Sequence, residues 1–141
     1  GKTGYLLYFV MYAGAVGVSL LSTYSKNKEN YYYSSLGASG GVSAVVFAKI
    51  VLDPIMGIGL IFIPVFIAGF LFGIIYLLIS YQLDKSNSKT INHSAHIWGS
   101  VFGVVYIIAL CQISGRYPLL QQMLEQIKNM QLDQVIRFGT N

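Results

Sequence analysis

The sequence contains few charged residues. Asp, Glu, Lys and Arg make up 10% of its 141 residues, while 55% are hydrophobic; a soluble domain usually devotes about a quarter of its residues to these four charged types. The charges that are present fall mostly between long apolar runs rather than within them. This distribution argues against a water-soluble domain and predicts an integral protein of the cell membrane.

The low number of cysteines and the lack of a basic patch exclude two further features: an internal disulfide and a nucleic-acid partner. Because Cys111 is the single cysteine, the chain cannot form an internal disulfide. The net charge is +4, but the lysines and arginines are scattered singly and form no basic patch. The sequence therefore predicts no nucleic-acid partner.

Four apolar stretches are candidate membrane spans, and a helical span needs about 20 residues to cross the hydrocarbon core. Three of them contain no charge: residues 5–24, 57–83 and 95–113. The fourth, 36–52, is shorter and carries Lys49. The expected fold is all-α, a polytopic membrane helix bundle with about four transmembrane helices.

Polar and broken stretches separate these spans. Residues 25–35 and 84–92 are polar and predict loops. Residues 56–64 are apolar but interrupted by two glycines and Pro64. Because proline and glycine disfavour a helix interior, the third helix is expected from about residue 65 to 82.

The C-terminal part has a different character. In residues 117–130, leucine, isoleucine and methionine recur at helical spacing opposite glutamine, glutamate and lysine. This pattern predicts an amphipathic helix that does not span the membrane. We therefore divide the chain into a transmembrane domain, 1–113, and an amphipathic tail, 114–141. The chain starts at Gly1 without a methionine, so we expect it to be a piece of a longer polytopic protein.

Two polar residues near span starts are candidates for chemistry, because polar side chains inside a membrane are costly and tend to be functional. Ser39 lies at the amino end of the second span and His96 at the amino end of the fourth. Span starts separated by two crossings lie on the same side of the membrane. A serine beside an imidazole is the minimum for nucleophilic catalysis, since the base takes the hydroxyl proton during attack.

The surroundings of Ser39 fit a nucleophile. It lies in Gly-Ala-Ser-Gly-Gly, residues 37–41, where a helix is expected to start. The first backbone N–H groups of a helix have no intrahelical partner and carry positive potential. An oxyanion placed there would be stabilised, and losing one such donor typically costs about 3 kcal/mol.

Other interpretations remain open at this point. Residues 37–41 and 99–103 both form Gly-x-x-x-Gly, a helix-packing pattern, and Ser39 could be a helix cap. His93 and His96 could suggest a metal pair, but no third ligand stands nearby in the sequence, so no metal is expected.

Residues 34–43 and 93–99, followed by Gly103, resemble the nucleophile segment and the histidine helix of rhomboid intramembrane serine proteases of the bacterial type. The order and spacing of the two motifs match. The resemblance covers residues 1–113 and corresponds to the carboxy-terminal four spans of a six-span core.

The resemblance implies that Ser39 is the nucleophile and His96 the general base of a dyad, with the backbone N–H groups of Ala38 and Ser39 in the oxyanion hole. It implies hydrolysis of peptide bonds in or near transmembrane segments. The implied partners are membrane lipid and transmembrane protein substrates, without a cofactor. The implied location is the cell membrane, spanned several times, and within it the bacterial inner membrane. Gly99 and Gly103 would let the histidine helix pack closely on the serine helix.

The chain also departs from the family pattern. No His-x-x-x-Asn occurs to assist the oxyanion, and Ser43 stands where many members carry an aromatic residue. Trp98 replaces a small residue and is expected to face lipid, because the two glycines occupy the close-packed stripe. One alternative is a catalytically inactive rhomboid-like protein that binds client transmembrane helices. A second is a channel or transporter segment, supported only by the glycine-broken residues 56–64.

Overall fold

The computed structural model describes residues 1–30, 38–60, 63–85, 92–115 and 118–139. Within them the chain is mostly helical. The elements, in chain order, are α1 (Lys2–Asn27), α2 (Ala38–Leu52), β1 (Gly57–Leu60), β2 (Ile63–Ala68), α3 (Gly69–Lys85), α4 (His93–Ser114), α5 (Leu119–Lys128), α6 (Leu132–Val135) and β3 (Ile136–Phe138).

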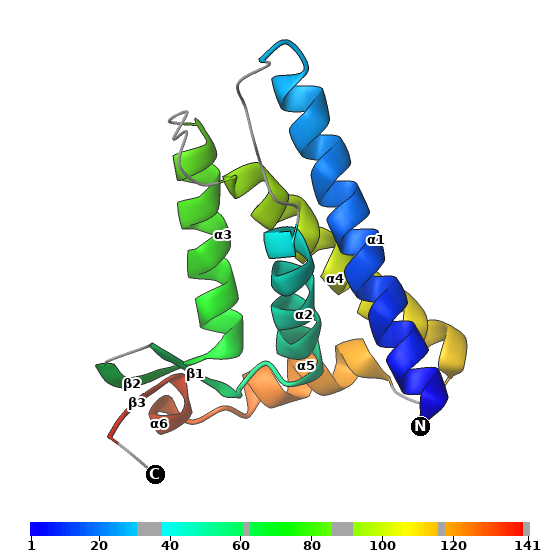
Figure 1. The fold of residues 1–141 in the computed structure, drawn as a ribbon. Helices are drawn as coiled ribbons and strands as arrows, with labels where there is room; N and C mark the ends of the chain where they lie inside the picture. Colours follow the sequence, from blue (N-terminus) through cyan, green and yellow to red (C-terminus); the bar gives the residue numbers. More distant parts are fainter. Residues whose placement is uncertain (31–37, 61–62, 86–91, 116–117, 140–141) are drawn as a thin grey trace.

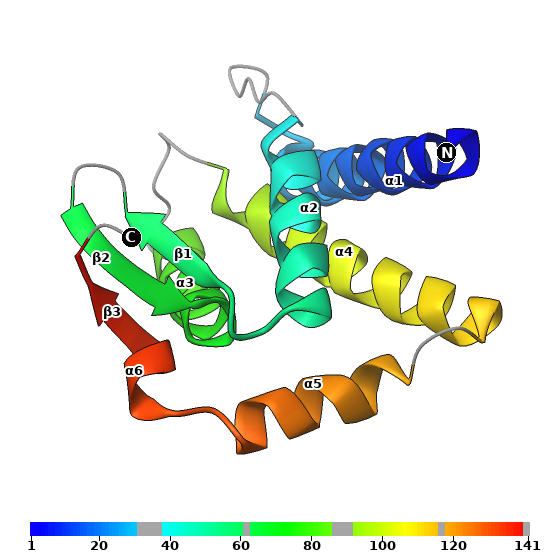
Figure 2. The ribbon, with the colours of Figure 1, turned by 90° about the horizontal axis from the view of Figure 1, so that it is seen from below.

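Helices α2 and α4 form the centre of the bundle. This pair contacts α1 on one side and α3 on the other, and α5 runs across the lower end of α2 (Figures 1 and 2). The sheet lies below α3, at the same end as the amino terminus (Figure 1). The upper end therefore carries the start of α2, the start of α4 and the end of α1.

Two of the described helices are long and apolar enough to cross a membrane. They are α1, with 26 residues, and α4, with 22. Helix α2 is a shorter apolar helix of 15 residues, and α3 has 17. These four helices correspond to the four predicted spans. Helices α2 and α3 are shorter than the about 20 residues that usually span a membrane.

The all-α prediction is wrong for one region, because the described residues include a three-stranded antiparallel sheet in the order β1-β2-β3. The predicted helix start at residue 65 is also wrong, since α3 begins at Gly69. The region is rich in β-branched residues, which favour strands. Pro64 lies in β2 where the pairing with β1 shifts register between Gly59 and Leu60, an irregularity of the kind at which proline is found in sheets.

The predicted loops are shorter than expected. Helix α1 continues through residues 25–27 and α3 through residues 84–85. Most of the remaining residues of both predicted loops lie outside the described residues.

The predicted amphipathic helix is confirmed as α5. Leu119 is buried against Val51 of α2 and Cys111 of α4, and Met123 packs on the same cluster, while Gln121, Gln122 and Glu125 are exposed. Leu124, on the predicted apolar face, is also 63% exposed. Beyond α5, strand β3 pairs with β2 through residues 136–138, so the tail contacts the helical part at two places. The division of the chain at residue 113 stays a prediction.

Helices α2 and α4 are in backbone contact. A Cβ added to Gly99 would lie 2.7 Å from Gly40 Cα, and one added to Gly103 would lie 2.6 Å from Ala44 Cα. Both distances are too short for any residue but glycine, so the predicted close packing of these two helices is confirmed. Trp98 is 48% exposed and lines a hollow together with Lys26 of α1 and Asp84 of α3. That its ring faces lipid or a loosely packed side of the bundle stays a prediction.

This contact predicts opposite effects for two glycine substitutions. Gly103→Ala should destabilise the bundle by about 1–3 kcal/mol, because its methyl group would force two backbones apart. Gly17→Ala on α1 meets nothing within 4 Å and should be neutral or stabilising by up to about 1 kcal/mol, because alanine favours a helix. Unfolding titrations in mixed detergent micelles would measure both, and equal effects would contradict the packing argument.

Candidate active site

Ser39 lies in the first turn of α2. The helix begins at Ala38, so Ser39 is its second residue and is not the residue that caps it. The side chain is half-buried. The backbone N–H groups of Ala38 and Ser39 belong to the first four of the helix, which lack intrahelical acceptors.

Helix α1 contacts this first turn. The hydroxyl of Tyr12 donates to the carbonyl oxygen of Ala38 at 3.4 Å, and its ring lies against Gly41. A Cβ added to Gly41 would lie 2.7 Å from the Tyr12 ring. The start of α2 is therefore packed on α1 as well as on α4.

His96 lies at the level of Ser39. A Cβ added to Gly40 would lie 3.1 Å from the carbonyl oxygen of Ala95, and Gly40 also touches Gly99. The residue after Ser39 thus contacts the residue before His96. The structure brings the two predicted residues to adjacent backbone positions, and their side-chain separation stays a prediction.

Two rings flank the imidazole of His96. The ring of Tyr76 on α3 is stacked on it, with centroids 6.1 Å apart and an interplanar angle of 23°. The ring of His93 meets it edge-on, at 6.0 Å and 80°. The Tyr76 hydroxyl in turn forms a hydrogen bond of 3.1 Å with the hydroxyl of Ser43, one turn after Ser39.

His93 is the first residue of α4 and is only 7% exposed. Its Nδ1 atom is buried and has no hydrogen-bond partner among the described residues. This burial at the start of α4 fits a structural role for His93. Within the described part of the chain, no group of three His, Cys, Asp or Glu side chains could hold a metal ion.

A polar junction fixes the start of α4 on α1. Ser19 Oγ donates to the Ala95 carbonyl at 3.0 Å, and Thr23 Oγ1 donates to the Ser19 carbonyl at 2.8 Å. Asn92 caps α4 by accepting from the Ala95 N–H at 3.1 Å. It also donates to Thr23 Oγ1 at 2.6 Å. The hydroxyls of Ser22 and Ser94 form a further hydrogen bond of 2.8 Å between the same two helices.

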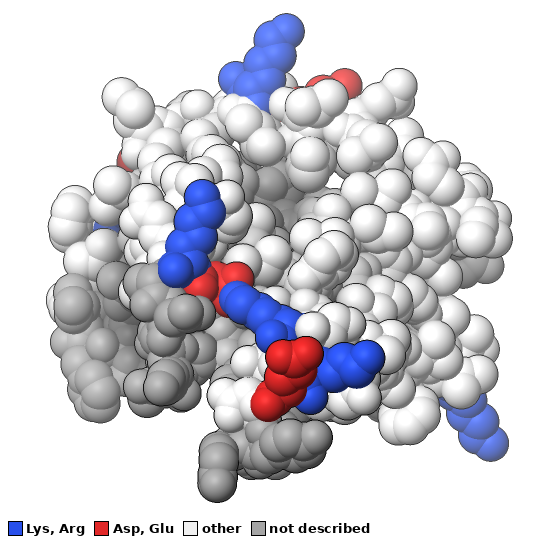
Figure 3. All heavy atoms as spheres, turned by 90° about the horizontal axis from the view of Figure 1, so that it is seen from above, with Lys and Arg blue, Asp and Glu red and all other residues white. Residues whose placement is uncertain are grey.

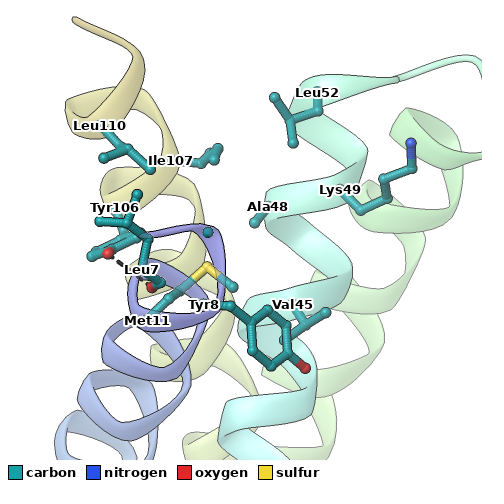
Figure 4. A pocket seen from close by; sticks show the side chains of 11 residues that line it. Leu7, Tyr8, Met11, Val45, Ala48, Lys49, Leu52, Tyr106, Ile107 and Leu110 are labelled. Carbon is teal, nitrogen blue, oxygen red and sulfur yellow. Dashed lines mark hydrogen bonds between the residues drawn. The ribbon is translucent and has the colours of Figure 1, made fainter. Parts of the chain in front are cut away.

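The upper end of the bundle carries charged side chains. Seen from above, several acidic and basic side chains lie next to one another in a band (Figure 3). One such pair is Lys26 of α1 with Asp84 of α3, 2.5 Å apart. Between α1, α2 and the far half of α4 lies a groove of about 340 Å³ with mostly apolar walls, including Met11, Val45 and Ile107 (Figure 4).

Comparison with known proteins decides the family. A family model described as the rhomboid domain matches residues 1–113. The chain belongs to the rhomboid family. As a rhomboid domain it is a polytopic membrane bundle surrounded by lipid, in a family that includes serine proteases. Searches of curated proteins and of solved structures gave no significant match.

Sequence reasoning on this rhomboid domain missed two groups of residues. The first is the polar junction, although Ser19, Ser22 and Thr23 recur at helical spacing in an apolar run, which is a usable signal for a helix contact. The second is Tyr76, which lies in the apolar stretch of residues 57–83 that predicts a span. No spacing in the sequence indicates that it meets His96.

The junction predicts energetic coupling between Thr23 and Asn92. Asn92→Ala should destabilise the protein by about 1 kcal/mol through loss of the cap. In a double-mutant cycle with Thr23→Val, the two effects should be non-additive by roughly 0.6 kcal/mol or more, because the pair shares one part-buried hydrogen bond. Unfolding titrations of the four proteins give the coupling. Additive effects would show that this hydrogen bond contributes nothing.

Proposed function

We propose that this rhomboid domain belongs to an intramembrane serine protease that hydrolyses peptide bonds in or near transmembrane segments, with Ser39 as nucleophile and His96 as general base. The observation that carries the proposal is the contact of Gly40 with Ala95 and Gly99. It holds the first turn of α2 against the α4 segment that bears His96.

The chemistry follows from the residues at this contact. Ser39 Oγ attacks the scissile carbonyl carbon while a ring nitrogen of His96 accepts the hydroxyl proton. The negative charge that develops on the carbonyl oxygen is stabilised by the N–H groups of Ala38 and Ser39 at the start of α2. His96 then donates the proton to the leaving amine. Water, activated by the same histidine, hydrolyses the acyl-enzyme.

The length of α2 supports cleavage below the membrane surface. A 15-residue helix measures about 22 Å at about 1.5 Å per residue, against a hydrocarbon core of about 30 Å. If its lower end lies near one interface, the first turn lies several ångströms beneath the other. The substrates are then transmembrane proteins whose helix unwinds near Ser39.

The two alternatives are less well supported. An inactive protein that binds client helices needs neither Ser39 nor His96, yet both are present at one level of the bundle. A channel or transporter was suggested by residues 56–64, but β1 places residues 57–60 in a sheet at the lower end, beside the bundle (Figure 2). The proposed location is a bacterial inner membrane.

The proposal predicts covalent labelling of Ser39. A fluorophosphonate should label the detergent-solubilised protein, and Ser39→Ala or His96→Ala should abolish labelling while leaving thermal unfolding unchanged within a few degrees. His93→Ala should keep measurable labelling. Ser114→Ala, at the far end of α4, is the matched serine control and should label normally. A folded wild-type protein that is not labelled would favour the inactive client-binding alternative.

A substrate assay completes this test. In proteoliposomes, a single-span model protein with a helix-destabilising segment should be cut by the wild type and by Ser114→Ala. The Ser39→Ala variant should cut it at least about a thousand-fold more slowly, since little remains once the nucleophile is lost.

A further inference from the structure

Tyr76 contacts both helices that carry the proposed dyad. It projects from the middle of α3 toward α2 and α4. Its ring contacts Phe47 of α2, with centroids 5.7 Å apart, and it stacks on His96 of α4. Its hydroxyl bonds to Ser43 of α2 at 3.1 Å. A single side chain thus joins three helices at the site.

The contacts on α2 lie on the helix face that carries Ser39. Residues four apart on a helix are neighbours on one face, so Ser39, Ser43 and Phe47 form one row. Tyr76 packs against the second and third members of this row. The imidazole of His96 stacks on Tyr76 and therefore lies on the side of α2 that carries this row.

An imidazole on a helix can rotate about two side-chain bonds, and only some orientations point a ring nitrogen at a given hydroxyl. A ring stacked at 23° restricts that rotation, because turning the imidazole would lose the face contact. The hydrogen bond to Ser43 and the stacked Phe72 ring, 5.9 Å away, fix Tyr76 itself. Orientation of the base is a large part of what a catalytic pair requires.

We infer that Tyr76 is a positioning residue for His96, held in place by Ser43, an inference that rests on the proposed function. Because Tyr76 belongs to α3, the orientation of a base carried by α4 depends on where a third helix lies. The Lys26–Asp84 ion pair links α3 to α1 at the upper end. A simpler alternative is that Tyr76 only fills space among α2, α3 and α4.

Labelling kinetics with a fluorophosphonate separate orientation from space filling. Tyr76→Ala should lower the maximal labelling rate about ten- to a hundred-fold, since a misoriented base loses part of the roughly 10²- to 10⁴-fold that general-base catalysis contributes. The probe concentration for half-maximal rate should change little. Tyr76→Phe keeps the ring and should stay within about threefold of wild type. Tyr81→Ala, an exposed tyrosine on the same helix, is the matched control and should label normally.

An exchange of the two partners tests the role directly. Ser43→Tyr combined with Tyr76→Ser nearly conserves volume, which membrane and soluble cores tolerate best, and presents the ring to His96 from α2 instead of α3. The double variant should therefore be labelled at least about five times faster than Tyr76→Ser alone. Lack of recovery in a variant that unfolds like wild type would mean that Tyr76 only fills space.

A measurement without activity keeps the two proposals separate. The chain has two histidines, so His93→Gln assigns the ring-proton NMR signals of His96. A ring stacked on His96 shifts these signals upfield, and the shift should be lost in Tyr76→Leu but kept in Tyr76→Phe. An unchanged spectrum in Tyr76→Leu would overturn the inference whether or not the protein is a protease. If the shift behaves as expected but Ser39 is never labelled, the proposed function fails and the stacking stands.

Discussion

The backbone contact between α2 and α4 is the constraint on which the rest of the structure depends. In lipid, no hydrophobic force drives helices together, so association relies on close van der Waals contact and a few hydrogen bonds. Gly99 and Gly103 allow the two backbones to touch where any Cβ would overlap, and a Cβ on Gly40 would overlap with the side chain of Ser19 on α1. Sliding one helix along the other would break this match at every glycine. The level of Ser39 relative to His96 is therefore set by packing, not by the two side chains.

The remaining helices are attached to this pair in different ways. Helix α1 is held by the polar junction, whose hydroxyls and amide would each lack a partner if they faced hydrocarbon. Helix α3 contacts the pair mainly through apolar and aromatic side chains, such as Gly73 against Phe47 and Tyr76 against His96. Directional hydrogen bonds fix one side of the histidine helix, and ring packing supports the other.

The sequence was sufficient for the main helices and the glycine contact, because these follow from local hydropathy and small-residue spacing. It was insufficient for the sheet. Strand β3 at 136–138 pairs with β2 at 63–68, and no pattern within either segment indicates a partner so distant along the chain. The sequence also did not predict the contact of Tyr76 with His96. This contact depends on the rotation of α3 about its axis, which no local pattern determines.

The polarity of the bundle limits where water can reach the candidate dyad. The groove between α1, α2 and α4 has apolar walls apart from Lys49 and two tyrosines, and the Tyr106 hydroxyl is already bonded to the Leu7 carbonyl. A buried water needs two to four polar partners, which these walls do not offer in one place. Hydroxyls, the Asn92 amide and charged side chains gather instead around the starts of α2 and α4. Hydrolysis at Ser39 would accordingly draw its water from the upper end, beside the residues that activate it.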